Sequence, residues 1–172
     1  MIIELESLTE RRNSISWEIP PDEIDLSDEN ARLDSASVSV IVEAGLESVL
    51  IKGTVRTEIG SGCVRCLEPF RHEQLIEFTA EFVSEDKFPS EKELELRGEE
   101  LTVDIYDGVS IDLTSVVREQ IVLDLPSYPV CAPECMGLCP ICGVNRNIDD
   151  CSCTDESVDP RWDVLKEIAG EK

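Results

Sequence analysis

Residues 51–82 read IKGTVRTEIGSGCVRCLEPFRHEQLIEFTAEF, and this stretch decides the fold of the chain. Two runs in it alternate apolar or β-branched side chains with polar ones. The apolar-side members are Ile51, Val55, Thr57 and Ile59 in the first run, and Ile76, Phe78, Ala80 and Phe82 in the second. A period of two residues is typical of a half-buried β-strand. The Gly60-Ser61-Gly62 turn and a cysteine-containing knuckle between the runs predict that the second strand returns antiparallel to the first.

Further strands are predicted on both sides of this hairpin. A strand is predicted from Ser37, because Val38, Val40 and Val42 alternate with the residues between them in a β-branched run. The other predicted strands are shorter and cover residues 2–8, 15–19 and 101–105. Two acidic, turn-rich segments are expected to be surface loops: 20–34 and 84–100.

One amphipathic helix is predicted after the strands. Asp112 is a suitable N-cap, and apolar residues follow it at helical spacing: Leu113, Val116, Val117 and Ile121. Pro126 limits the far end. A short second helix is predicted at 159–168. We therefore predict an α+β fold, with an antiparallel β-rich body at residues 1–125, one or two helices, and a small C-terminal cysteine-rich zinc module at 126–172.

The chain is strongly acidic. It has 38 Asp and Glu against 15 Lys and Arg among 172 residues, a net charge of −23. Because nucleic-acid binding depends on basic side chains that replace counterions on phosphates, little direct RNA or DNA contact is expected. The same charge attracts basic proteins, although a merely solubilising surface is the alternative interpretation.

The cysteines are expected to bind metal rather than to form disulfides. No stretch approaches the roughly 18 to 20 apolar residues that a membrane span needs. The start, MIIELE, lacks the basic and apolar regions of a secretory signal. A cytoplasmic protein without membrane contact is the expectation. In that reducing compartment, eight cysteines favour metal ligation over structural disulfides.

Six cysteines lie near the C-terminus: Cys131, Cys135, Cys139, Cys142, Cys151 and Cys153. Zinc prefers four tetrahedral ligands and binds thiolates well. Cys139 and Cys142 have the two-residue spacing of a zinc knuckle, with Gly143 permitting a tight turn behind them. Cys139, Cys142, Cys151 and Cys153 are the simplest ligand set, and Cys131 or Cys135 could replace either of the last two. Reduced cysteines packed as small apolar residues would need a core that this segment lacks.

Cys63 and Cys66 form a second C-x2-C pair at the hairpin turn. One interpretation is half of a second zinc site, completed by Cys131 and Cys135, which makes two zinc ions instead of one. Another is a dithiol redox pair, although no thioredoxin-like βαβ pattern surrounds it. The third is a structural role in which buried cysteines pin the turn.

The sequence has few candidate catalytic residues, and no enzyme is predicted. The single histidine, His72, is expected to be a polar surface residue. No Ser or Cys nucleophile has a recognisable partner, and there is no Gly-rich phosphate loop. Asn145 and Asn147 are expected to support the loop between the ligand pairs through hydrogen bonds to its backbone.

Taken together, these motifs resemble the YceD family, the large ribosomal RNA subunit accumulation proteins. The resemblance rests on Cys63-x-Arg65-Cys66-Leu67, on the array CMGLCPICGVNRN at 135–147 and on the Cys-Ser-Cys closure at 151–153, with Asp-Pro-Arg-Trp at 159–162 like the family's ending. It spans roughly residue 40 to the end. Met136 stands where the family often has Lys, and Arg146 where it often has Leu. Some members of the family lack the C-terminal cysteines.

The resemblance implies a bacterial, non-enzymatic factor that helps large-subunit ribosomal RNA to be made, processed or kept stable. The acidity adds the expectation of a basic partner, such as a ribosomal protein, or of a large-subunit precursor reached through one. Two alternatives remain from the residues alone. One is a zinc-containing interaction adaptor outside ribosome assembly, and the other is a thiol-redox or metal-sensing protein.

Overall fold

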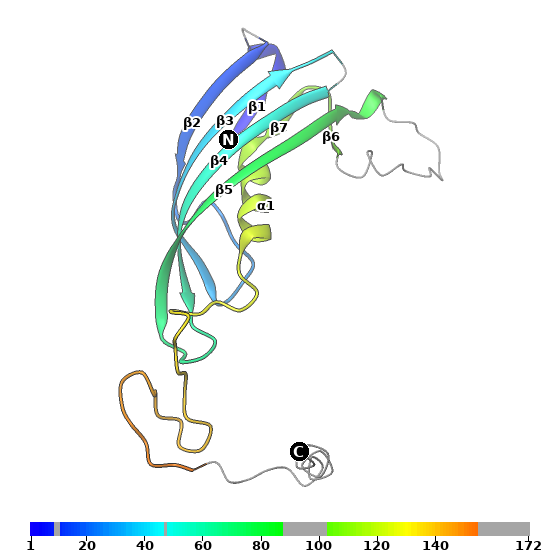
Figure 1. Cartoon of the computed structure of the whole chain (residues 1–172). Helices are drawn as coiled ribbons and strands as arrows, with labels where there is room; N and C mark the ends of the chain where they lie inside the picture. The colour runs from blue at the N-terminus through cyan, green and yellow to red at the C-terminus, as the bar shows by residue number, and fades with distance from the viewer. Residues whose placement is uncertain (9–10, 47, 88–102, 155–172) are drawn as a thin grey trace, which may run out of the picture.

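The fold is built on one curved, mixed β-sheet (Figure 1). A computed structural model describes residues 1–8, 11–46, 48–87 and 103–154. The sheet has the strand order β2-β3-β4-β5-β6. Its strands are β2 (Arg12–Ile19), β3 (Ala31–Ala44), β4 (Ser48–Gly62), β5 (Pro69–Ser84) and β6 (Val103–Tyr106). Neighbours from β2 to β5 are antiparallel, whereas β6 lies parallel to the end of β5.

A smaller unit lies on the inner side of the curve (Figure 1). Strand β1 (Ile2–Glu4) pairs antiparallel with β7 (Ser110–Asp112), and helix α1 (Leu113–Asp124) follows β7 directly. Two single-turn 3₁₀ helices, η1 (Leu5–Ser7) and η2 (Glu85–Lys87), complete the described elements. No helix in the described ranges is long and apolar enough to cross a membrane.

The core lies between the sheet and α1. Alternate residues of the three longest strands are buried, as their period of two requires. These strand residues meet the buried face of α1, which consists of Leu113, Val116, Val117 and Ile121. Since burying one such aliphatic side chain is worth about 1.5–3 kcal/mol, this interface is the main source of stability in the body.

Gly53 lets Phe78 close over the middle of the sheet. The two residues are directly opposed in β4 and β5. A Cβ atom at Gly53 would lie 2.3 Å from Cε1 of Phe78 and 3.0 Å from Cγ1 of Val40. The missing side chain is therefore the space that the phenyl ring fills.

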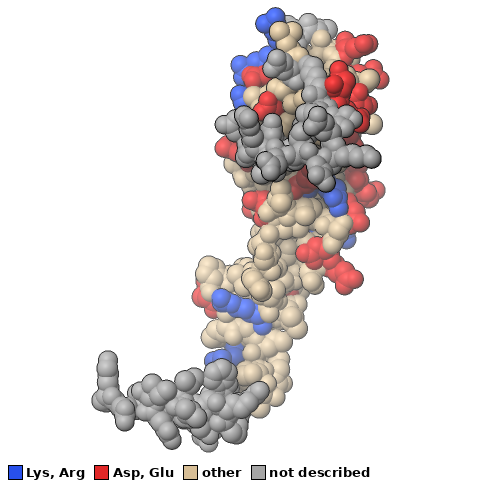
Figure 2. Space-filling view, turned by 90° about the vertical axis from the view of Figure 1, so that its right-hand side faces the viewer, with Lys and Arg blue, Asp and Glu red and all other residues tan. Residues whose placement is uncertain are grey.

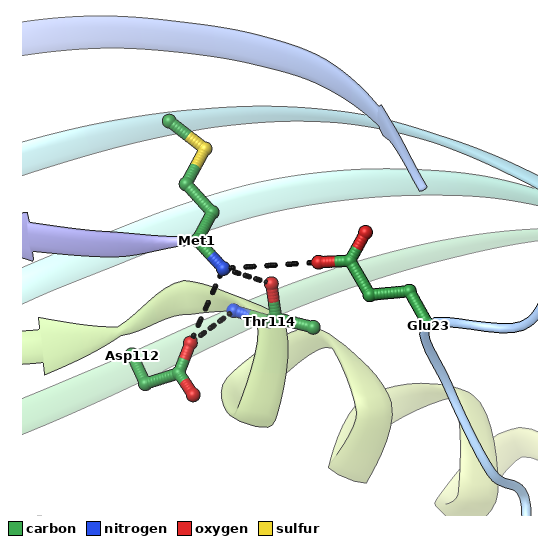
Figure 3. A network of polar contacts seen from close by, with 4 residues as sticks. All are labelled: Met1, Glu23, Asp112 and Thr114. Carbon is green, nitrogen blue, oxygen red and sulfur yellow. Dashed lines mark hydrogen bonds and ion pairs between the residues drawn. The ribbon is translucent and has the colours of Figure 1, made fainter. Parts of the chain in front are cut away.

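The start of α1 is fixed by a polar network (Figure 3). The Asp112 carboxylate accepts a hydrogen bond of 3.0 Å from the backbone N–H of Thr114, which confirms the predicted N-cap. The α-amino group of Met1 lies 3.5 Å from the same carboxylate, 4.0 Å from Glu23, and donates to the Thr114 hydroxyl. The charges thus hold β1 and the 20–30 segment at one end of the helix.

The hairpin, the β3 strand and the helix are confirmed. The predicted turn at Gly60-Ser61-Gly62 is wrong, because these residues continue β4 and pair with β5, and the chain turns in the cysteine knuckle that follows. The predicted surface loop at 20–34 is wrong in two respects. Strand β3 already begins at Ala31. Within the loop, Ile24 and Leu26 are buried in the core, and Arg118 of α1 donates a hydrogen bond of 2.7 Å to the carbonyl of Asp25. The prediction failed because Ile24 and Leu26 stand among acidic residues in the sequence, yet their side chains cover one end of the core.

The shorter predicted elements differ mainly in their bounds. The predicted strand at 2–8 stops at Glu4 and continues as η1, whereas the one at 15–19 begins earlier, at Arg12. The strand expected at 101–105 is β6, whose parallel pairing makes the sheet mixed rather than wholly antiparallel. Most of the expected loop at 84–100 and the predicted helix at 159–168 lie outside the described residues.

Candidate metal centres

The turn between β4 and β5 is a tight C-x2-C knuckle. The N–H of Cys63 donates to the carbonyl of Glu68 at 2.9 Å, and the N–H of Leu67 donates to the carbonyl of Cys63 at 2.8 Å. These bonds require a left-handed residue after the second cysteine, and Leu67 has φ +63°. A leucine in that conformation costs about 1–2 kcal/mol relative to glycine.

A second knuckle at Cys139 and Cys142 repeats this pattern. The N–H of Cys139 donates to the carbonyl of Val144 at 2.8 Å, and the N–H of Gly143 donates to the carbonyl of Cys139 at 2.9 Å. Gly143 has φ +74° and occupies the position of Leu67 in the first knuckle. The two C-x2-C motifs are therefore the same turn, used twice.

Each knuckle meets another pair of cysteines. We call the group of Cys63, Cys66, Cys131 and Cys135 the proximal cluster, and the group of Cys139, Cys142, Cys151 and Cys153 the distal cluster. Within each cluster all four sulfurs lie within 4.8 Å of one another. All eight thiols are free.

The sulfur spacing fits a tetrahedral metal. In the proximal cluster, Sγ of Cys63 is 3.8 Å from Sγ of Cys135, and Sγ of Cys66 is 3.7 Å from Sγ of Cys131. Four thiolates about 2.3 Å from a zinc ion at tetrahedral corners would lie about 3.8 Å apart. Both clusters could hold a metal ion, and four-sulfur donor sets suit zinc or iron.

The grouping matches two of the sets considered from the sequence. The distal cluster is the simplest predicted ligand set. Cys131 and Cys135 lie with Cys63 and Cys66, as the second-site interpretation requires, and not with the distal cysteines. Because the proximal cluster joins residues from both sides of the predicted boundary at 125/126, the two predicted domains share one candidate site. That these eight cysteines are ligands stays a prediction.

The first cysteine of each knuckle has a lowered pKa. Burial alone would raise the pKa of Cys63, but backbone N–H donors from Cys131, Cys66 and Arg65 lower it to about 6. The backbone N–H groups of Cys142 and Ile141 likewise lower the pKa of Cys139 to about 6. Each knuckle thus favours a thiolate at its first cysteine.

At least one returning cysteine in each cluster has the opposite shift in pKa. The side chain of Cys135, together with burial, raises the pKa of Cys131 to about 12. In the distal cluster, the side chain of Cys142 and burial raise the pKa of Cys153 to about 12. A thiolate opposes ionisation of the sulfur beside it, and a divalent cation among four sulfurs would reverse this effect.

The segment after α1 is attached to the first knuckle by backbone hydrogen bonds. The N–H of Val64 donates to the carbonyl of Pro129, and the N–H of Leu138 donates to the carbonyl of Arg65, both at 2.9 Å. Arg65 Nη1 donates to the carbonyls of Pro133 and Cys135 at 3.0 and 3.1 Å. These contacts place the distal knuckle next to the hairpin tip.

Gly137 is required at this junction. It has φ +70°, and a Cβ atom there would lie 2.9 Å from the carbonyl oxygen of Arg65. A larger residue would push against the backbone of the first knuckle, so the conformation and the close approach both demand glycine.

Asn147 connects the two clusters. Its Nδ2 donates to Sγ of Cys135 at 3.3 Å and to Oδ1 of Asn145 at 2.8 Å, while its Oδ1 accepts from the N–H of Met136 at 2.8 Å. Asn147 belongs to the loop between the two distal cysteine pairs, yet it contacts a proximal sulfur. The expected support of the loop by Asn145 and Asn147 therefore includes a link to the neighbouring cluster.

The two clusters differ in exposure. Three of the four proximal cysteines are buried and form a small apolar group with Phe70 and Val130, whereas only Cys139 is buried in the distal cluster. His72 belongs to neither cluster. Its ring stacks on Phe70 with centroids 5.5 Å apart, and both ring nitrogens are shielded without a hydrogen-bond partner in the described structure. His72 is thus half-buried rather than fully exposed.

The charge is unevenly distributed over the face seen in Figure 2. Asp and Glu are spread over the β-sheet body, whereas the surface toward the cysteine-rich end is mostly uncharged, with a few groups of both signs. On this face, most of the acidic charge therefore lies on the β-sheet body.

The fold and the paired clusters define a mixed-sheet protein with two tetracysteine candidate metal centres at one end of its longest hairpin. The chain belongs to the YceD family: the family described as "Large ribosomal RNA subunit accumulation protein YceD" matches residues 51–169, which include all eight cysteines. The family is named for ribosomal RNA accumulation and not for a catalysed reaction.

Several curated proteins are similar to the chain. An uncharacterized protein of Mycobacterium tuberculosis H37Rv is 36% identical over 83% of this chain and 65% of its own length. One of Mycobacterium leprae is 29% identical over 74% of this chain and 56% of its own length. The chloroplastic large ribosomal RNA subunit accumulation protein YCED homolog 1 of Zea mays is 29% identical over 70% of this chain and 49% of its own length. The chain thus spans about two thirds or less of these relatives, and no solved structure matches it.

Proposed function

We propose that this chain is a non-enzymatic factor that supports the accumulation of large-subunit ribosomal RNA by acting on a basic protein partner, with a structural zinc ion in each cluster. The observation that carries the proposal is the match to the YceD family over a region that contains both tetracysteine clusters. The role in RNA accumulation comes from the family's name. Metal bound in the two clusters would hold the segment after α1 rigidly on the hairpin and so give the partner a fixed surface to bind.

Zinc in these clusters is proposed to be structural rather than catalytic. Structural zinc sites are closed by four protein ligands, whereas catalytic sites keep one position open for water or substrate. Each cluster offers four sulfurs and leaves no such position. The described residues after α1, up to 154, have almost no apolar core of their own. Metal binding would therefore supply most of the free energy that folds this segment onto the hairpin.

The partner is proposed to be a basic protein, such as a large-subunit ribosomal protein. The net charge of −23 repels phosphate backbones and attracts basic surfaces. Zinc would not change this sign, because one divalent ion bound by four thiolates leaves each cluster with a net charge of about −2. An acidic protein that holds a basic ribosomal protein would keep it soluble until it meets its RNA.

Depletion in cells tests the function directly. In a strain that depends on this chain, depletion should lower large-subunit ribosomal RNA relative to small-subunit RNA, and re-expression of the intact chain should restore the ratio. An unchanged ratio would favour the adaptor interpretation outside ribosome assembly. Purified chain that binds protein-free large-subunit RNA, but none of the purified large-subunit proteins, would contradict the proposed partner.

A further inference from the structure

Leu67 is the strained residue of the first knuckle. Its φ of +63° is the left-handed conformation that glycine adopts readily and leucine does not. The second knuckle, with the same hydrogen bonds, has Gly143 at the equivalent position. Folding alone would therefore favour glycine at both positions.

Burial inside the chain does not compensate for this strain. The side chain of Leu67 is 70% exposed, and it belongs to neither hydrophobic cluster of the described residues. Val64, in the spacer of the same knuckle, is 49% exposed. Strain of this kind persists at sites where the residue serves a purpose outside the fold.

The surroundings of these two side chains indicate the kind of surface that they fit. Glu68 follows Leu67 directly, and Glu134 precedes Cys135 of the proximal cluster; both side chains are exposed. Arg65 donates to the backbone carbonyls of Pro133 and Cys135. An apolar tip flanked by exposed carboxylates complements an apolar pocket that is bordered by Lys or Arg.

We propose that Val64 and Leu67 are the apolar anchor with which the first knuckle docks into a pocket on the basic protein partner. This inference rests on the proposed function and names the part of the chain that makes the contact. The knuckle is suited to that task because its backbone is fixed on three sides, by β4, by β5 and by the segment after α1. A pre-ordered anchor loses little conformational entropy when it binds.

The test uses Leu67→Gly in the full-length chain. This substitution removes the apolar side chain and relieves the backbone strain. Binding to the partner should therefore weaken, while the stability of the knuckle should stay equal or rise. Leu123→Ala is the matched control, because Leu123 is a 79% exposed leucine on α1, away from the knuckle. The probes are purified basic large-subunit ribosomal proteins, each titrated against the immobilised chain, with protein-free large-subunit RNA in a parallel arm.

We expect Leu67→Gly to bind the protein partner about tenfold or more weakly, which is the scale for truncating a central anchor. Its metal content should stay unchanged and its resistance to denaturant should be equal or higher, while Leu123→Ala binds like the wild type. Unchanged binding of Leu67→Gly to a protein that the wild type binds would overturn the anchor and leave the proposed function intact. Binding of the wild type to RNA alone, or to none of the proteins, would overturn both.

Discussion

Asn147 is the side chain through which the distal loop stabilises the proximal cluster, and Asn147→Ala tests this link. The substitution removes the Nδ2–H···Sγ bond to Cys135 and leaves the N–H of Met136 without its acceptor; it also removes the bond to Asn145 within the distal loop, which the control for loop integrity must cover. If each of the two bonds that reach the proximal side contributes about 1 kcal/mol, the loss is about 2 kcal/mol, or about 30-fold in zinc affinity. That value lies within the range of about 10–100-fold for groups that orient metal ligands.

The assay is competition with a zinc chelator whose absorbance reports the free metal. It is performed on chains with both clusters intact, because the distal loop that carries Asn147 needs its own metal to fold. The zinc-release step that is absent from Cys66→Ser is assigned to the proximal cluster. Ile148→Ala is the control, because Ile148 is 69% exposed and contributes only its backbone to the loop. An affinity within about threefold of the parent, or an equal loss in the control, would refute the proposed link.

Three further substitutions test the body of the protein by denaturant unfolding of the metal-loaded chain. Ile121→Ala should lower the free energy of unfolding by about 3 kcal/mol because it leaves a cavity under α1, whereas the exposed Leu123→Ala should change it by less than about 0.5 kcal/mol. Asp112→Ala removes the N-cap of α1 and should cost about 1 kcal/mol, and a neutral result would argue against the cap. The backbone N–H groups of Ser110 and the residue before it lower the pKa of Asp107 below its ordinary value. Since the folded pKa is lower than the unfolded one, Asp107 stabilises the fold above about pH 4 and loses this effect as the pH falls through its folded pKa. The wild type should therefore be more stable than Asp107→Ala at pH 7 and converge with it in acid, and a difference that grows in acid would contradict the assigned sign.

The central hairpin could be predicted because the alternation in residues 51–82 is local information. A period of two residues and a turn between the runs specify both strands and their direction. The N-cap at Asp112 is equally local, since one acceptor and the N–H two residues later define it. The parallel pairing of β5 with β6 could not be predicted, because no local pattern in residues 81–84 indicates that Val103–Tyr106 lies beside them.

The candidate site could be predicted in part. The count of eight cysteines suggested two groups of four, but the pairing of Cys131 with the hairpin depends on the path of the chain after α1. Leu67 was missed, although a signal exists. Alignment of the two C-x2-C motifs places it opposite Gly143, and that comparison would have predicted its positive φ. The burial of Ile24 was hidden by the acidic residues around it.

Metal content per chain tests the central claim most directly. The chain is purified without added metal and measured by elemental mass spectrometry beside Cys66→Ser and Cys142→Ser, one substitution in each cluster. We expect two zinc ions in the wild type and one in each variant. A wild-type chain with one zinc or none, or a Cys66→Ser chain that keeps two, would contradict the account of two separate tetracysteine centres.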